Sequence, residues 1–452
     1  MRGTVQAAWP SIRDSTTGTL ADEVYFWRVR ARDWAGNRSA YGVVRTFTVQ
    51  AGVARWQPSA PGVDAGGGVS STATPSVDPC MAVNPVSGQA GVVWCDQDAS
   101  NGDLEVFMRE RVGIAFAELA GSASGGGVSN DATISQTPTI AYDASGRPVV
   151  AWCDSGDGGT EVYVRRYDGV AWAELAGSAS GGGVSANGTS STAPSLAVNR
   201  ATGRPGVAWV DSHAGDTEVF FREFNGVGWA ELGGSGTGQG LSANGGASLD
   251  PSLAYDALGR AIIAWSDGSS GNDEVYVRRW NGGAWEELAG SASGGGVSRT
   301  SAASRHPSVA VGESGSPVVV WEERLAEGSE IHGRRWNGAA WVEAGAGSAT
   351  GGGISTTTGI SMKPHLSANA AGTLMLVVWT DGSDPGGDYE VYGKLLSNGA
   401  WREVGASSAR GGGISNNVST STNACGGVGA NYAYVSWQDG AAGNWEVYVR
   451  RL

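Results

Sequence analysis

Five side chains with oxygen atoms suited to a metal ion crowd into ten residues of the sequence. They are Asp96, Asp98, Asn101, Asp103 and Glu105. Carboxylate and amide oxygens are the ligands that Ca²⁺ takes, about six to eight at a time. A second stretch of the same length carries Asp381, Asp384, Asp388 and Glu390. Both stretches are candidate calcium sites, and an acidic hairpin turn is the alternative, because Asp also bonds its own turn backbone.

Four basic side chains depart from the pattern around them and form a second group of candidates. Arg305 and His306 stand in "SRHPS", and Lys363 and His365 stand in "MKPHL". The two stretches occupy the same place in neighbouring repeats of the chain. The four side chains are therefore predicted to form one small basic spot that binds a ligand, and scattered loop variation is the alternative.

No set of unlike groups that would converge for catalysis stands out in the sequence. We find no Ser-His-Asp order and no pair of histidines with metal-ligand spacing. The "GGG" runs are not followed by a helix start, which a phosphate loop requires. The sequence therefore predicts that the protein is not an enzyme and requires no cofactor.

The elements that must position these residues are seven copies of one repeat of about 57 residues. The phrase "GGGVS" or a close variant begins at 66, 125, 181, 238, 294, 351 and 411. A second marker, a Trp that ends an apolar run, recurs every 56 to 58 residues. Its copies are Trp94, Trp152, Trp209, Trp265, Trp321, Trp379 and Trp437.

Each repeat is predicted to contain four short strands, for example 194–198, 205–210, 218–224 and 228–232. The last two are joined by Asn-Gly or Asp-Gly, which favours a tight hairpin. Four antiparallel strands repeated seven times indicate an all-β, seven-bladed propeller, with a stacked solenoid as the alternative. The last repeat lacks its fourth strand, and residues 54–58 before the first "GGGVS" are predicted to supply it and close the ring.

Most of the recurring residues are predicted to be structural. The seven copies of the Trp are expected to pack between blades, because buried aromatics dominate core energetics. An Asp or Glu begins and a Glu ends the second hairpin of every repeat, as Asp96 and Glu105 do in the first. Trp280 and Trp336 stand beside Asn-Gly turns in two repeats only. They are candidate stacking surfaces for a ligand, and packing is the alternative.

The four cysteines fall into two pairs of equivalent repeat positions. Cys80 and Cys425 lie in the first strand of the first and last repeats, which ring closure makes neighbours. We predict a disulfide bridge between them. Cys95 and Cys153 each follow the repeated Trp, and whether they pair is left open. Four buried thiols are the alternative; disulfides would indicate an exported protein.

Residues 1–50 do not fit the repeat that fills residues 51–452. The segment "EVYFWRVRARDWAGNRSAYGVVRTFTV" (23–49) resembles the C-terminal half of a fibronectin type III domain. The shared features are the Tyr-x-Trp-Arg-Val-x-Ala strand, the "DWAGN" turn and the closing "TFTV" strand. The resemblance implies a spacer in a longer exported protein. Open strand edges of a half-sandwich also predict self-association.

Two further resemblances cover the repeats. The turn in "RYDGVAW" (166–172) or "RRWNGGAW" (278–285) resembles the Asp-box of sialidase-type propellers. The "NG…W.EL.G" pattern is similar to bacterial seven-bladed propeller lectins. Both imply a glycan ligand. The three-arginine cluster and Tyr–Glu pair of sialidases are not matched, because the arginines here recur periodically after the third strand.

Composition excludes other classes of partner. The net charge is −14 without a basic run, so nucleic acid is not an expected partner. No apolar run reaches the length of a membrane span. We therefore expect an extracellular or cell-surface, non-enzymatic module that binds a glycan or another surface ligand. The first alternative is a surface scaffold or self-assembling protein, and the second is a glycoside hydrolase of sialidase type.

Overall fold

The chain divides into two compact units, Met1–Arg55 and Trp56–Leu452. The computed structural model describes residues 56–452 except 64–65, 99–100, 157, 213–214, 358, 398 and 406. In the first unit it describes β1 (Glu23–Trp27) and β2 (Arg45–Val49), which pair in antiparallel fashion. The remainder of the partial fibronectin type III segment predicted for residues 1–50 lies outside the described residues, so that assignment stays a prediction.

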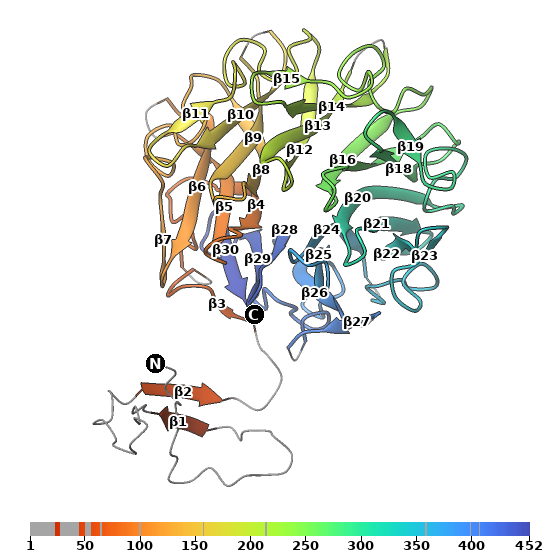
Figure 1. Ribbon diagram of the computed structural model, residues 1–452. Helices are drawn as coiled ribbons and strands as arrows, with labels where there is room; N and C mark the ends of the chain where they lie inside the picture. The colour runs from red at the N-terminus through yellow and green to blue at the C-terminus, as the bar shows by residue number, and fades with distance from the viewer. Residues whose placement is uncertain are drawn as a thin grey trace, which may run out of the picture. The chain divides into compact units, whose positions relative to one another are not determined.

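The second unit is a ring of seven four-stranded antiparallel sheets, or blades (Figure 1). The innermost strands are β4 (Val77–Val83), β8 (Ser135–Tyr142), β12 (Ser191–Asn199), β16 (Ser248–Tyr255), β20 (Ala303–Val311), β24 (Ser361–Ala368) and β28 (Ser421–Val428). The second strands are β5 (Ala90–Gln97), β9 (Pro148–Asp154), β13 (Arg204–Asp211), β17 (Ala261–Asp267), β21 (Pro317–Leu325), β25 (Met375–Asp381) and β29 (Ala433–Asp439).

The outer half of each blade is a hairpin. The third strands are β6 (Leu104–Val112), β10 (Glu161–Tyr167), β14 (Glu218–Phe224), β18 (Glu274–Trp280), β22 (Gly328–Trp336), β26 (Glu390–Ser397) and β30 (Glu446–Arg451). The outermost strands are β7 (Ala115–Ala117), β11 (Trp172–Glu174), β15 (Trp229–Ala230), β19 (Trp285–Glu287), β23 (Trp341–Glu343), β27 (Ala400–Glu403) and, in blade 7, β3 (Gln57–Pro58).

The N-terminal strand closes the ring, as the sequence predicts. β3 pairs with β30 through Gln57↔Arg451 and Pro58↔Arg450. The amide of Val69 also donates to the carbonyl oxygen of Val447 at 2.6 Å. The two ends of the repeat region therefore share one blade, and the all-β seven-bladed propeller is confirmed.

The repeated Trp of each second strand is buried between blades. All seven copies are at most 1% exposed. In every blade this Trp packs against an aromatic ring of the third strand. The ring centroids of Trp209 and Phe220, for example, are 5.9 Å apart. The outermost strands add a hydrogen bond between blades, because the indole of Trp229 donates to the carbonyl oxygen of Leu175 in the preceding blade at 2.9 Å. These contacts confirm the packing role predicted for the repeated tryptophans.

The "GGGVS" phrase ties the connection between blades to the third strand. Its serine hydroxyl donates to the Glu that begins that strand, as Ser129 does to Glu105, and accepts the amide of Val106 at 2.8 Å. The third glycine has φ +65° at Gly127, and a Cβ atom there would lie 2.4 Å from the carbonyl oxygen of Val106. Only glycine allows this approach. The buried Glu of each hairpin is therefore a structural residue.

Because these carboxyl groups are buried, we expect the free energy of unfolding to fall as the pH rises. Burial raises the pKa of Glu105 and of Glu390 to about 7, against the opposing hydrogen bonds from Ser129 and Ser415. Folding therefore favours the protonated form, and this stabilisation is complete below the ordinary pKa and lost as pH rises through about 7. Between about pH 5 and pH 8, the free energy of unfolding of the parent should fall. We expect this fall to be about 1–3 kcal/mol smaller per site in the double variant E105Q/E390Q. Melting curves across this range measure the difference; parallel curves for the two proteins would contradict it.

Candidate functional site

One residue of every innermost strand adopts a left-handed backbone conformation next to a register shift. The seven residues, which we call the crown, are Asp78, Thr137, Ala193, Asp250, His306, Lys363 and Asn423, with φ between 48° and 52°. The register of each innermost strand shifts at these positions. Such a conformation is uncommon for residues other than glycine. The crown therefore presents six types of side chain on seven copies of one backbone geometry, at the start of the strands that surround the axis (Figure 1).

A pocket of about 340 Å³ opens between blades 5 and 6 beside two crown residues, His306 and Lys363. Its other lining residues come from the hairpin of blade 5 and from the start of blade 6. They are Glu322, Arg324, Leu325, Gly328, Ser329, Ile360 and Met362.

The wall of this pocket exists because the strand pairing in the hairpin of blade 5 extends further than in its equivalents. β21 and β22 remain paired as far as Leu325↔Gly328. The hairpin then contacts the next blade, where Ser329 forms an isolated parallel bridge with Ile360. The hydroxyl of Ser329 also donates to the carbonyl oxygen of Ser361 at 2.7 Å. The break in the repeat at "ERLAEGSE" thus builds one side of the pocket.

Glu322 lies at the base of the pocket and gathers three donors. Its Oε2 is 3.0 Å from Nδ1 of His306 and accepts the amide of Lys363 at 3.3 Å. Its Oε1 accepts Nε of Arg324 at 3.1 Å. Burial alone would raise the pKa of Glu322, but His306, the Lys363 amide and Arg324 together hold that pKa below its ordinary value. Glu322 is therefore a buried carboxylate that carries its negative charge.

His306 is the member of this group that reaches the solvent. Its side chain is 30% exposed, while the side chain of Glu322 is 4% exposed. The second ring nitrogen, Nε2, lies 3.8 Å from Oδ2 of Asp250 in the neighbouring blade. A carboxylate on one imidazole nitrogen fixes the tautomer and orientation of the ring. The arrangement equips His306 to give or take a proton at the mouth of the pocket.

Two cations border the same pocket in an otherwise acidic protein. The side chain of Arg324 is 50% exposed, and Lys363 is exposed as a residue. Within the described part of the chain, no ion pair or hydrogen bond of the Lys363 ammonium is found. With Glu322 as the one carboxylate among the lining residues, the pocket has a positive balance of charge. Such a pocket favours an anionic ligand.

The structure brings together only two of the four basic residues predicted to form one spot. His306 and Lys363 both line the pocket. Arg305 forms an ion pair with Asp273 of blade 4, outside the pocket lining. His365 lies on the innermost strand of blade 6, where its Nδ1 accepts the amide of Gly426 at 3.2 Å.

His365 occupies a position that links each blade to the next. In blades 3, 4 and 5 this position is a serine, whose hydroxyl accepts an amide of the following blade, as Ser252 does from Val309 at 3.0 Å. The other serine copies are Ser195, which accepts the amide of Leu253, and Ser308, which accepts that of Leu366. His365 thus has a structural role as an acceptor between blades 6 and 7. It was predicted to belong to the ligand-binding spot, but it is not among the residues that line the pocket.

A serine at residue 365 should remove a pH dependence of stability. Burial lowers the pKa of His365 to about 4. The unfolded chain then takes up a proton near pH 6.5 that the folded chain refuses, so this contribution is complete above about pH 6.5 and is lost as pH falls through about 4. The variant H365S has the serine that blades 3 to 5 carry at this position. We expect its free energy of unfolding to fall by about 1–3 kcal/mol less than that of the parent over this pH range. Urea unfolding at several pH values measures this; an equal loss in both proteins would refute it.

The four cysteines are free thiols, so the structure does not contain the predicted Cys80–Cys425 bridge. Cys425 is the blade 7 copy of the position of His365, and its Sγ accepts the amide of Met81 in blade 1 at 3.2 Å. Its Sγ lies 3.5 Å from that of Cys80, too far for a bond. Cys95 and Cys153 are buried, and this burial raises the pKa of both thiols. Ring closure explains the adjacency without a bridge.

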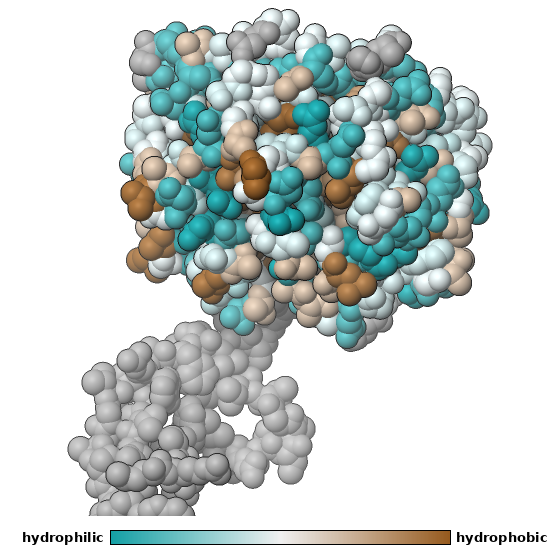
Figure 2. Space-filling model, turned by 45° about the horizontal axis from the view of Figure 1, so that its top comes forward, coloured by the Kyte–Doolittle hydropathy of each residue, from teal (hydrophilic) through white to brown (hydrophobic). Residues whose placement is uncertain are grey.

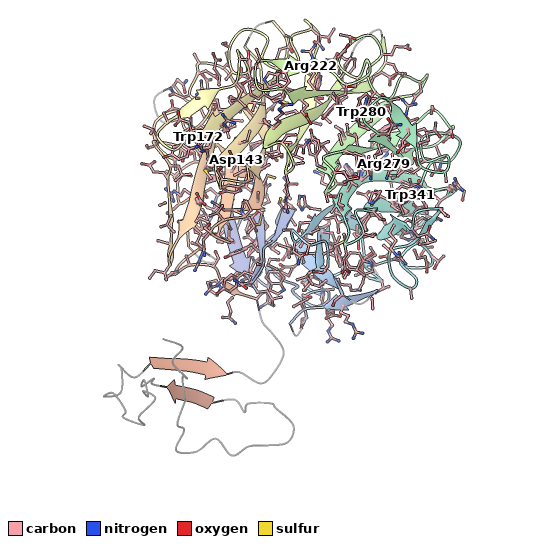
Figure 3. The ribbon with its side chains drawn as sticks, in the orientation of Figure 1. Asp143, Trp172, Arg222, Arg279, Trp280 and Trp341 are labelled. Atoms are coloured by element: carbon pink, nitrogen blue, oxygen red, sulfur yellow. The ribbon has the colours of Figure 1, made fainter. Side chains whose placement is uncertain are left out.

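Trp280 and Trp336 are half-buried members of a longer series. Trp280 pairs across the strands with Trp285, with ring centroids 5.6 Å apart. The same cross-strand position holds Tyr167 in blade 2 and Phe224 in blade 3, each beside the Trp of its outermost strand. Figure 3 shows Trp280 and Arg279 together in blade 4, with Trp172 and Trp341 in two other blades. The structure places them away from the pocket lining.

The two candidate calcium stretches lie in the hairpins of blades 1 and 6. Asp96 accepts hydroxyls from Thr72 at 2.7 Å and from Ser76 at 2.6 Å. Asp381 accepts the hydroxyl of Ser361 at 2.8 Å and the indole of Trp379 at 2.8 Å. Among the described residues, no group of three or more His, Cys, Asp or Glu side chains is arranged to hold a metal ion. Calcium binding stays a prediction, and the melting temperature with and without calcium tests it.

Sequence reasoning missed Glu322, Arg324 and Asp250. A signal for the first was present, since Glu322 follows the repeated Trp. The other blades have uncharged residues at that position: Cys95, Cys153, Val210, Ser266, Thr380 and Gln438. A charge in one copy of a buried position marks a functional candidate.

Comparisons with known proteins find likeness in solved structures only. No family model matches the chain, and no curated protein matches it by sequence. A ulvan lyase of the polysaccharide lyases is 11% identical, with a TM-score of 0.47 over 83% of this chain and 93% of that one. A sialidase of Trypanosoma rangeli is 10% identical, with a TM-score of 0.41 over 93% of this chain and 56% of that one. An α-L-arabinofuranosidase of Fusarium graminearum is 13% identical, with a TM-score of 0.43 over 76% of this chain and 97% of that one.

The expectation of a non-enzymatic binding module is corrected by this comparison. The three named structures are enzymes by their names, so they agree better with the second alternative, a glycoside hydrolase of sialidase type. The likeness itself extends to the propeller fold. Within the described residues, no helix has the length and apolar character that a membrane span requires.

Proposed function

We propose that this protein is a glycan-cleaving enzyme and that it acts on an anionic polysaccharide at the pocket between blades 5 and 6. The observation that carries the proposal is the buried Glu322 carboxylate bonded to the half-exposed His306. The other six blades have no charged residue at the position of Glu322. A site for chemistry in a repeat protein must break the repeat, because unlike groups have to converge on one point.

Each residue has a role in this proposal. His306 is the catalytic residue that transfers a proton at the glycosidic linkage. Glu322 is a positioning residue, since it contacts the imidazole at Nδ1 and leaves Nε2, which lies 3.8 Å from Oδ2 of Asp250, for proton transfer. Lys363 and Arg324 bind the anionic group of the sugar.

The surface agrees with a hydrated substrate. Figure 2 shows hydrophilic residues over much of the visible face of the propeller, with hydrophobic residues in small, separate patches. A polysaccharide of this kind is met outside the cell, so we also propose that the protein is exported. Self-association stays a prediction, which sedimentation at increasing concentration tests.

A panel of polysaccharides tests the proposed function. Pectate, alginate and hyaluronan supply carboxylated chains, and dextran supplies a neutral control. We expect new chain ends from at least one anionic polymer, none from dextran, and none when the variant H306A replaces the parent. Ultraviolet absorbance of unsaturated uronates distinguishes elimination from hydrolysis. Folded protein that cleaves no anionic polymer, or H306A with full activity, would refute the proposal.

A further inference from the structure

The crown continues beyond the pocket as a second cluster of polar side chains in blades 7 and 1. Asn423 donates through Nδ2 to Oδ1 of Asp78 at 3.1 Å and to Oε1 of Gln438 at 3.1 Å. The same oxygen of Gln438 accepts the amide of Asp78 at 2.8 Å. Gln438 thereby fixes both crown residues, as Glu322 fixes His306 and the Lys363 amide in blades 5 and 6.

This cluster keeps hydrogen-bonding capacity for a ligand. Asp78 and Asn423 are both partly exposed. Within the described residues, no hydrogen bond to Oδ2 of Asp78 or to Oδ1 of Asn423 is found. A carboxylate and a carboxamide accept hydrogen bonds from vicinal hydroxyl groups, which are the defining groups of a sugar.

Lys363 connects the pocket with this cluster. Burial raises the pKa of Asp78, and the positive charge of Lys363 opposes that shift, so the two side chains are within electrostatic reach. Blades 6, 7 and 1 are consecutive around the ring. A ligand that leaves the pocket past Lys363 therefore meets Asn423 and then Asp78. Beyond blade 1, the crown positions of blades 2 and 3 offer only Thr137 and Ala193.

We infer that Asp78 and Asn423 form a second sugar-binding subsite, which holds the unit next to the one in the pocket. The inference rests on the proposed function for the identity of the ligand. The substrate then follows the crown from blade 5 through blades 6 and 7 to blade 1 as an extended chain. Gln438 is a positioning residue of this subsite.

The variants D78A and N423A test the subsite with a size-graded ladder of oligogalacturonates. Alanine is accepted at this backbone position, because Ala193 has the same left-handed conformation. We expect each variant to bind long oligomers about tenfold more weakly, the effect of one or two lost hydrogen bonds, and to bind the shortest oligomers unchanged. D78N should retain most of the affinity. T137A, at the crown position of blade 2 and outside the proposed subsite, is the matched control.

Calorimetric titration measures binding independently of turnover, so the two proposals can fail separately. Length-dependent binding that D78A weakens, without any cleavage, would support the subsite and refute the proposed function. Cleavage with an unchanged affinity of D78A and N423A for long oligomers would overturn the subsite and leave the proposed function standing. Absence of oligogalacturonate binding by the parent protein would also overturn the subsite.

Discussion

Replacing Glu322 with glutamine is expected to lower kcat on the cleaved glycan by about 100-fold. Glutamine still accepts the amide of Lys363, so the strand pairing and the pocket wall are kept. It removes the negative charge that Nδ1 of His306 contacts at 3.0 Å. The imidazole then loses the partner that selects its tautomer and fixes its orientation. H306A, which removes the proton-transfer group itself, should cost about 100-fold to 10,000-fold.

A comparison of kcat with KM separates this positioning role from a structural one. Loss of the Glu322 charge should lower kcat and leave KM near the parental value, because Lys363 and Arg324 still bind the substrate. Mere destabilisation of blade 5 would instead lower the melting temperature together with the amount of active protein. S266A alters the equivalent position of blade 4, where no hydrogen-bond partner of the hydroxyl is found among the described residues, and should retain full activity. An E322Q variant with parental kcat would exclude Glu322 from the mechanism.

Removal of residues 1–71 is expected to lower the free energy of unfolding by about 5 kcal/mol or more. The deletion removes β3 and three buried side chains, Ala60, Val63 and Val69, which pack against the last blade. It also removes the Ser70 hydroxyl that bonds the buried carboxylate of Glu446. Chemical denaturation measures the loss.

The matched control for this truncation is removal of residues 1–55. That deletion takes away the first compact unit and leaves the closing strand in place. We expect the chain that lacks residues 1–55 to have the same denaturation midpoint as the parent. If the chain that lacks residues 1–71 also unfolds at the parental midpoint, blade 7 is stable with three strands and the prediction is wrong.

The fold could be predicted almost completely because it depends on seven copies of the same short-range signals. The apolar run before Trp209, the Asn-Gly turns and the missing fourth strand of the last repeat each have one local meaning. Agreement among copies removes the ambiguity of any single strand. The blade-linking positions could not be recognised in the same way, since Ser252, His365 and Cys425 look unrelated until the strands are placed side by side.

The site could be predicted only in part, because its residues are recognised by their departure from the repeat and not by their recurrence. His306 and Lys363 were found because each departs from the repeat, and both line the pocket. His365 departs from it equally, yet it only replaces a serine as an acceptor for the next blade. Departure from a repeat therefore detects a changed residue, but it does not tell whether that residue has acquired a new partner or has taken over an old contact.

The constant backbone of the crown has a consequence for how such a protein acquires new chemistry. Seven residues share one φ value within a few degrees while their side chains include acid, base, amide and methyl groups. Exchanging one of them requires no rebuilding of the scaffold. The pair His306 and Glu322 of blade 5 corresponds to Ala193 and Val210 of blade 3. The substitutions A193H and V210E would place a second acid–base pair at the equivalent position two blades away, so each of the seven crown positions can carry a reactive group on the same backbone.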